Sequence, residues 1–179
     1  EAASICRFYG KRLPTEAEWT SAAFLEQRQT PPSGYTKGQR YPFPGGATPE
    51  VSHCLNGCGD YKGVAPAGAL NRGTGHVPTG TTKPGVNGLL DMGGNVWEWT
   101  ADWYKADYYA ECKNKGVVRN PQGPEKSFDP DEPFAEKRVT RGGSFLCSDQ
   151  YCSGFRIGAR MKTSWDTGLN HTGFRCAVS

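Results

Sequence analysis

Apolar and polar side chains alternate in the stretch Gly94-Asn95-Val96-Trp97-Glu98-Trp99, which is the pattern of a short β-strand. The aromatic run continues just beyond it in Asp102-Trp103-Tyr104. The sequence before this strand is different, because residues 30–88 are dense in Gly, Pro, Ser and Thr and follow neither the strand nor the helix period. We therefore expect a long ordered loop there, of the kind that is functional or pinned by a disulfide or a metal ion.

Two helices are predicted before this loop. Residues 1–9 have the pattern of the last turns of a helix, with Ala2, Ile5, Cys6 and Tyr9 on one face and Gly10 placed to end it. Thr15 and Glu18 have the spacing of a capping box, in which the two side chains satisfy free backbone amides at a helix start. This signal predicts a helix over about residues 16–27.

The composition predicts a loop-rich domain with a core made of few bulky residues. The chain has 179 residues with 24 Gly and 13 Pro, and its hydrophobic share of 36% is low for a globular protein. An aromatic content of 12% nevertheless argues against disorder. Residues 138–147 and 173–178 are predicted to form further short strands. No repeat or linker divides the chain, so residues 1–179 are predicted to form a single domain.

The charge and the cysteine content indicate which partners and which cellular compartment to expect. The net charge is +3, and the 21 basic residues form no run that would follow a nucleic-acid backbone, so we expect no nucleic-acid partner. No segment approaches the roughly 20 apolar residues of a membrane span. Seven cysteines indicate an oxidising compartment or a metal site, and the odd count leaves at least one thiol unpaired. A secreted, periplasmic or ER-lumenal location is therefore expected.

Four blocks of this sequence resemble the formylglycine-generating-enzyme, or sulfatase-modifying-factor, family in order and approximate spacing. They are residues 10–19 (GKRLPTEAEW), 94–99 (GNVWEW), 141–145 (RGGSF) and 173–176 (GFRC). The resemblance implies an α+β, loop-rich, C-type-lectin-like fold with little regular secondary structure. It also implies that this chain is the C-terminal part of such a domain. The N-terminal segment of the domain would then have been cleaved off or be supplied by another chain.

The resemblance implies that Cys147 and Cys152 form an active site. In the family's oxidases a cysteine pair at this place and spacing binds copper(I), and a thiolate pair suits such a soft ion. The implied reaction uses molecular oxygen to convert a cysteine of a sulfatase-like polypeptide to formylglycine. Other residues at positions of the family's active site are Ser144, Tyr151, Trp97 and Asn95. The residues themselves leave open a structural disulfide that closes a short loop, and oxidation interconverts the two states.

Other functions occur on the same fold and stay open. One alternative is a non-catalytic ligand- or protein-binding domain, and another is a family oxidoreductase that acts on a small molecule. The paired cysteines favour the oxidase, because most binding modules have no need of them. Ser148 and His171 stand where the oxidases tend to carry Arg and Asn. His53, His76 and His171 show no metal-ligand spacing, which argues against an iron-dependent sulfoxide synthase.

Residues 91–98 resemble the family's calcium-binding loop. The resemblance implies that Asp91 and Glu98 give side-chain oxygens while Gly94 and Val96 give backbone carbonyls. Hard oxygen ligands in a Gly-containing turn suit calcium, which tolerates irregular geometry. The alternative is a surface turn whose acids are only solvated. A second calcium site would involve Asn71, but the residues around it diverge from the family pattern.

The resemblance also implies a disulfide between Cys6 and Cys176, which would tie the first helix to the last strand. A second bridge common in the family is expected to be absent. Its two positions are Ala23 and Ile157 in this chain, so apolar packing is expected in its place.

Three cysteines remain outside these pairs. Cys54 and Cys58 could form a disulfide, bind zinc with other ligands or stay reduced, and a disulfide is favoured because no second Cys or His pair has zinc-finger spacing. Cys112 is expected to be a free thiol.

Overall fold

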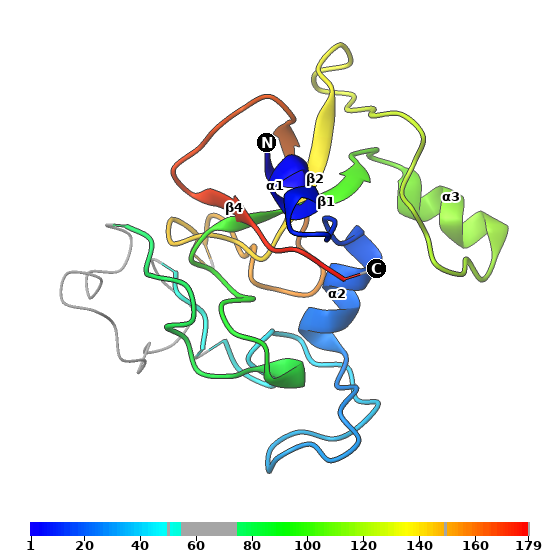
Figure 1. Ribbon diagram of the computed structural model, residues 1–179. Coiled ribbons are helices and arrows are strands. Elements are labelled where there is room, and N and C mark those ends of the chain that lie inside the picture. The colour runs from blue at the N-terminus through cyan, green and yellow to red at the C-terminus, as the bar shows by residue number, and fades with distance from the viewer. Residues whose placement is uncertain (50, 55–74, 149, 179) are drawn as a thin grey trace.

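The computed structural model describes residues 1–49, 51–54, 75–148 and 150–178 (Figure 1). Its elements in chain order are α1 (Ala2–Phe8), α2 (Glu16–Phe24), η1 (Val86–Gly88), β1 (Trp97–Trp103), α3 (Tyr108–Lys115), β2 (Lys137–Arg141), β3 (Met161–Ser164) and β4 (Thr172–Phe174). Long connections join these short elements. The prediction of an α+β, loop-rich fold is confirmed.

The four strands form one sheet in the order β3-β2-β1-β4. β1 runs antiparallel to β2 and parallel to β4, and β2 runs antiparallel to β3. The predicted strand around Trp97 is therefore a central one, with Trp97 opposite Thr172 and Glu98 opposite Arg141. In Figure 1, α2 lies beneath the sheet and α3 lies at the end of an excursion away from it.

Several predicted elements end earlier than expected. The helix predicted over residues 16–27 ends at Phe24, because Leu25 is extended and forms a β-bridge with Arg40. The strand predicted over residues 138–147 ends at Arg141, because Gly142 and Gly143 take positive φ angles of 96° and 79° and turn the chain. The strand predicted over residues 173–178 is shorter in the structure, where it runs over Thr172–Phe174.

Three elements were not predicted: the single turn η1, which lies in the predicted loop, and the longer elements α3 and β3. α3 has no buried residue and a polar surface, so it carries no apolar period. β3, with the sequence MKTS, is short and only half buried. Neither segment has the pattern from which helices and strands are recognised.

α1 is held by a covalent bond more than by an apolar face. Only Cys6 is buried, whereas Ile5 and Tyr9, which were placed on the same face, are exposed. Cys6 and Cys176 form the disulfide that the resemblance implies, with their Cα atoms 5.5 Å apart. The bridge brings the first helix next to the end of the chain (Figure 1).

α2 begins with the predicted capping box. The Thr15 hydroxyl accepts a hydrogen bond from the Glu18 amide at 3.2 Å, and the Glu18 carboxylate accepts one from the Thr15 amide at 2.8 Å. The helix then buries Trp19, Ala23 and Phe24 in one apolar cluster with Met92. Ile157 packs against the same cluster, so apolar packing occupies the place of the absent second bridge.

The four sequence blocks meet at one buried carboxylate. Glu98 is 6% exposed and accepts a 2.6 Å hydrogen bond from the Trp19 indole. Arg175 donates two further hydrogen bonds to it, each of 2.6 Å. Arg141 completes the group, because its guanidinium lies over the Trp19 ring at 5.5 Å. We call Trp19, Glu98, Arg141 and Arg175 the Glu98 node.

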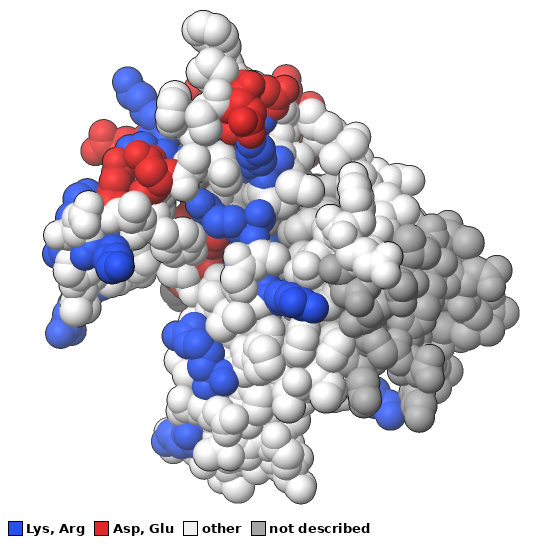
Figure 2. Space-filling model, turned by 180° about the vertical axis from the view of Figure 1, so that it is seen from behind, with Lys and Arg blue, Asp and Glu red and all other residues white. Residues whose placement is uncertain are grey.

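A second buried acid ties the segment before β2 to the sheet. Asp129 has no exposed surface and forms ion pairs with Lys137 and Lys162. On the face shown in Figure 2 the basic side chains lie in separate groups, and the acidic ones gather in the upper part of the view. Within the described part of the chain, no helix has the length and apolar character of a membrane span.

Asp102 lies buried where β1 meets the start of α2. Its carboxylate accepts a hydrogen bond from the Glu16 amide at 2.6 Å, and Gly123 packs against it. Burial raises the pKa of Asp102 to about 6, although the hydrogen bond from the Glu16 amide acts in the opposite direction. The negative charge of Glu16 raises it further.

Replacing Cys6 by Ser is expected to lower the free energy of unfolding by about 4–5 kcal/mol, because the bridge closes a loop with a sequence separation of 170. Denaturant unfolding without reductant measures the difference. Cys112→Ser is the control and should change stability by less than about 0.5 kcal/mol, since that thiol is free. Equal stability of Cys6→Ser and the parent protein would contradict the assignment.

Asp102 should make stability depend on pH in the acidic range. Its pKa is higher in the folded protein, about 6 against an ordinary 3.8, so the folded state holds the proton more tightly. The resulting stabilisation is complete below about pH 4 and is lost as the pH rises through about 6, to a total of up to about 3 kcal/mol.

Asp102→Asn should remove this dependence, as measured by denaturant unfolding across this pH range. The exposed Asp107→Asn is the control and should keep the slope of the parent protein. Identical slopes for the parent and Asp102→Asn would show that Asp102 does not titrate in this window.

Candidate functional site

The candidate site begins where β2 ends. Gly142 and Gly143 turn the chain with positive φ angles, and the turn is tight, because a Cβ atom on Gly143 would lie 2.9 Å from the backbone nitrogen of Phe155. The loop of residues 144–154 returns to the same place. This path brings Cys147 and Cys152 together.

Cys147 and Cys152 form a disulfide, with their Cα atoms 4.6 Å apart. Cys147 is 1% exposed and belongs to an apolar cluster with Trp97 and Phe155, against which Cys152 packs. Of the two states that the sequence left open, the structure therefore contains the oxidised one. The spacing of the pair is compatible with two adjacent sulfur ligands after reduction.

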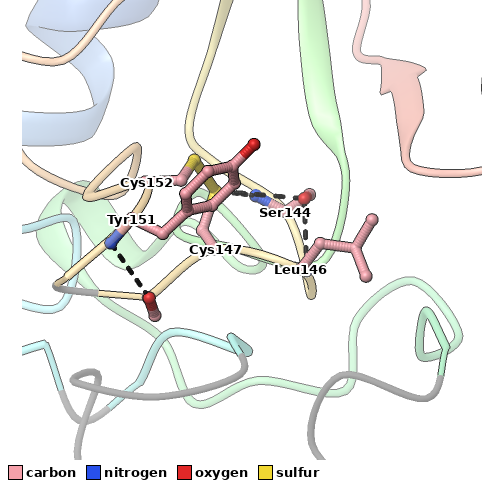
Figure 3. Close-up of a disulfide and its surroundings, with 6 residues drawn as sticks. Ser144, Leu146, Cys147, Tyr151 and Cys152 are labelled. Carbon is pink, nitrogen blue, oxygen red and sulfur yellow. Dashed lines mark hydrogen bonds between the residues drawn. A yellow bond between two sulfur atoms is a disulfide. The ribbon is translucent and has the colours of Figure 1, made fainter.

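Ser144 is the polar neighbour of the cysteine pair. Its amide donates a hydrogen bond to the Cys147 sulfur at 3.3 Å, and its hydroxyl lies 3.9 Å from the same atom. The Leu146 amide donates to the Ser144 hydroxyl at 3.3 Å, while the Leu146 side chain points away from the sulfurs (Figure 3). Ser144 can thus stabilise negative charge on the Cys147 sulfur.

Tyr151 lies on the solvent side of the loop. Its amide donates to the Ser148 hydroxyl at 3.1 Å, which fixes the backbone of the turn (Figure 3). The side chain is 89% exposed. It can therefore bound the site only from outside, and it does not line an enclosed pocket for oxygen.

Trp97 forms the inner wall of the site. It is buried at the start of β1 and packs against the cysteine pair. The indole also contacts Gly154 closely, because a Cβ atom added to Gly154 would lie 2.4 Å from the ring. Any larger residue at position 154 would displace the indole.

Asn95, which stands at a position of the family's active site, uses its side chain to bond the backbone of Val77. It has a φ of 63°, and its side-chain amide bonds both backbone groups of Val77, at 2.9 and 3.2 Å. Its own amide donates to the carbonyl of His53 at 2.7 Å. These bonds commit the Asn95 side chain to holding the segment at Val77 in place.

The two acids of the predicted calcium loop already have partners. The Asp91 carboxylate accepts hydrogen bonds from the amides of Gly80 and Thr82. Glu98 accepts those of Trp19 and Arg175, as described for the Glu98 node. The alternative of a surface turn whose acids are only solvated is therefore wrong, because Asp91 and Glu98 are both buried.

The loop still has oxygen atoms for an ion. A carboxylate has about four acceptor positions, and the bonds to Asp91 and Glu98 leave some of them open. The carbonyls of Gly94 and Val96 accept no hydrogen bond from the described residues. No group of three or more His, Cys, Asp or Glu side chains in the described ranges is arranged to hold a metal ion, so an ion here would rely on these carbonyls. Asn71 lies outside the described residues.

A cleft of about 240 Å³ is lined by Trp97 and by residues of the connection from β3 to β4. Its lining comes from Trp97, Glu132, Lys137, Met161, Lys162, Thr163, Ser164, Thr167, Leu169, His171 and Thr172. Apart from Trp97, none of these residues was predicted to belong to a site. Eight of the eleven fall within residues 161–172, and they match no sequence motif.

Of the remaining cysteines, Cys54 belongs to the buried cluster that contains Cys147 and Trp97. The predicted bond between Cys54 and Cys58 lies outside the described residues, because Cys58 does. Cys112 carries the expected free thiol. His171 is held beside Trp97, whose amide donates to the His171 carbonyl at 2.8 Å.

Known proteins are similar to this chain in sequence and in fold. The formylglycine-generating enzyme of Thermomonospora curvata is 37% identical over 180 residues, which cover 99% of this chain and 52% of that protein. The inactive C-alpha-formylglycine-generating enzyme 2 of Mus musculus is 31% identical, with 100% and 46% covered. Treponema denticola variable protein 1 superposes with a TM-score of 0.55 at 25% identity, over 91% of this chain and 45% of that one.

The chain thus spans about half the length of the curated relatives that it matches. The family model described as "Sulfatase-modifying factor enzyme 1-like domain" matches residues 1–179. The chain belongs to this sulfatase-modifying-factor, or formylglycine-generating-enzyme, family.

Proposed function

We propose that the protein that contains this chain oxidises a cysteine of a sulfatase polypeptide to formylglycine, with copper(I) held by Cys147 and Cys152. The observation that carries the proposal is the pairing of these two sulfurs against Trp97, in a chain of this family. Two adjacent thiolates are a donor set for a soft ion of low coordination number. The residues present therefore fit copper(I), which when bound would supply the centre for oxygen chemistry.

The proposal requires reduction of the disulfide first. A disulfide cannot act as a pair of thiolate ligands, so an external thiol must break the Cys147–Cys152 bond before metal binds. Cys152 is only partly buried, which gives such a thiol a point of attack. The oxidised pair is then a resting state of the site.

The surrounding residues would support the reaction by position and environment. The Ser144 amide, 3.3 Å from the Cys147 sulfur, would stabilise the thiolate form. Trp97 would exclude water from the inner side of the pair. The exposed Tyr151 would bound the outer side, where a substrate cysteine approaches.

A non-catalytic binding domain is the second candidate. The disulfide supports it, because a purely structural disulfide would close the same loop. Relatives that are named inactive, and the variable protein of similar fold, also support it. Copper(I) binding by the reduced protein separates the two candidates.

We also propose a structural calcium ion at Asp91, Gly94, Val96 and Glu98. The open carbonyls of Gly94 and Val96 support it, and the ion would fix the turn that leads into Trp97. An oxidising compartment outside the cytosol is proposed as well, supported by two disulfides among the described residues.

Replacing Cys147 or Cys152 by Ser should abolish copper(I) binding and lower peptide oxidation by about 100-fold or more, because a hard ligand replaces a soft one. The assay supplies reduced protein, copper(I), oxygen and a thiol reductant, and mass spectrometry follows a peptide with the sulfatase cysteine motif.

Cys112→Ser is the matched control for these replacements and should retain full activity. The oxidase proposal fails if the parent protein binds no copper(I) and leaves the peptide unchanged. It also fails if both cysteine variants remain active.

Calcium should raise the melting temperature of the metal-free protein by about 5–10 °C at saturation, because it binds the folded state alone. Since Glu98 also bonds Trp19 and Arg175, the informative quantity is the calcium-dependent shift in each variant. Asp91→Asn should reduce this shift, whereas the exposed Asp107→Asn should not. If chelation changes neither the melting temperature nor the metal content of the parent protein, the calcium site does not exist.

A further inference from the structure

Helix α1 has an exposed apolar face that the function proposed above does not use. Phe8 and Tyr9 follow Ile5 by three and four residues, so the three side chains lie on one side of the helix and its C-cap. They are 83%, 68% and 44% exposed, in that order. The rings of Phe8 and Tyr9 contact each other edge to face, with their centroids 5.2 Å apart. We call Ile5, Phe8 and Tyr9 the α1 face.

The α1 face reverses the usual orientation of a surface helix. Such a helix normally turns its apolar side chains towards the core. In α1 the only buried residue is Cys6, which is held by the bond to Cys176. Single exposed apolar residues need no explanation, but an apolar patch formed by neighbouring side chains marks an interaction site.

The end of the chain extends the α1 face. Arg12 and Ala177 form a β-bridge with two hydrogen bonds, of 3.0 and 2.7 Å. This antiparallel bridge places Val178 opposite Lys11, just beyond α1 (Figure 1). Val178 is 75% exposed. Both ends of the chain therefore contribute apolar surface, and the disulfide keeps them together.

An open edge of the sheet lies close to the same surface. β4 pairs with β1 on one side, and among the described residues no strand pairs with its other side. β4 ends at Phe174, two residues before Cys176, which is about 7 Å along an extended chain. An edge strand offers unpaired backbone N–H and C=O groups to a further extended segment. A segment that covers the α1 face therefore has backbone partners within reach.

The length of the related proteins indicates what covers this surface. The chain spans about half the length of the curated relatives that it matches, so each relative has about as much chain again outside the match. Glu1 is the N-cap of α1, and Val178 lies just beyond the other end of the helix. Polypeptide joined to either end of residues 1–179 thus starts beside the α1 face, where its tether gives it a high effective concentration.

We infer that, in the protein that contains this chain, polypeptide of the same molecule from outside residues 1–179 covers the α1 face and packs apolar side chains against Phe8 and Tyr9. The interface is intramolecular and buries surface that residues 1–179 leave exposed. The inference goes beyond the proposed function and does not depend on copper(I) at the cysteine pair.

Photo-crosslinking of the whole protein tests the inference. p-Benzoylphenylalanine replaces Phe8, and mass spectrometry identifies the residues that it captures on irradiation. We expect capture of residues outside residues 1–179 in protein that migrates as a monomer. Phe134, which is fully exposed in the segment before β2, is the matched control position. The same probe at position 134 should capture no such residue.

The melting temperature of the whole protein gives a second readout. Phe8→Asp places a charge in the inferred interface and should lower Tm by about 4 °C or more, because burial of an unpaired charge is unfavourable. Phe134→Asp is the matched control and should change Tm by less than about 1 °C, since its side chain stays in solvent.

The inference is overturned if the probe at position 8 captures only a second copy of the protein, only residues within 1–179, or nothing. Equal melting temperatures of the parent protein and Phe8→Asp would also contradict it. Copper(I) binding enters neither readout, so failure of this inference and failure of the oxidase proposal are distinguishable.

Discussion

The buried Glu98 carboxylate is the interaction on which the rest of the structure depends. It lies in the central strand and bonds Trp19 of α2 and Arg175 beyond β4. Removing one partner of such a pair leaves a buried charge without compensation, which typically costs about 3–5 kcal/mol. In a chain with short strands and few bulky core residues, this network fixes α2, β1 and the C-terminal segment relative to one another.

The cysteine site is built outward from the same place. Arg141 lies against Trp19, and directly after it the Gly142 carbonyl accepts a 2.7 Å hydrogen bond from the Gly94 amide. The Phe145 amide then donates to the Asn95 carbonyl at 2.8 Å. The loop with the cysteine pair is thus fastened to the turn before β1. Its sulfurs are positioned by a scaffold of buried polar bonds, although the loop itself has no regular secondary structure.

Sequence reasoning succeeded where single residues have a specific local role. Thr15 and Glu18 predicted the start of α2, because a capping box depends only on local backbone geometry. The four blocks predicted the fold because their residues meet in the Glu98 node. Cys6 and Cys176 were paired correctly from the resemblance.

It failed where a role depends on neighbours that are distant in the chain. Asn95 was placed at the chemistry, yet its side chain binds Val77, and no pattern in the sequence links the two. Tyr151 stands at a position of the family's active site, but its exposure could not be predicted, since the backbone at this residue is set by the turn at Ser148. The cleft beside Trp97 is formed where the β3–β4 connection meets residues from other parts of the chain, so no local sequence signal predicts it.

The central claim about the site is that Cys147 and Cys152 together hold the metal. X-ray absorption at the copper edge of the reduced, copper(I)-loaded protein tests this claim most directly. The account predicts sulfur neighbours around copper in the parent protein and fewer of them in Cys152→Ser, whereas copper surrounded only by nitrogen or oxygen, or unchanged by the substitution, would contradict it.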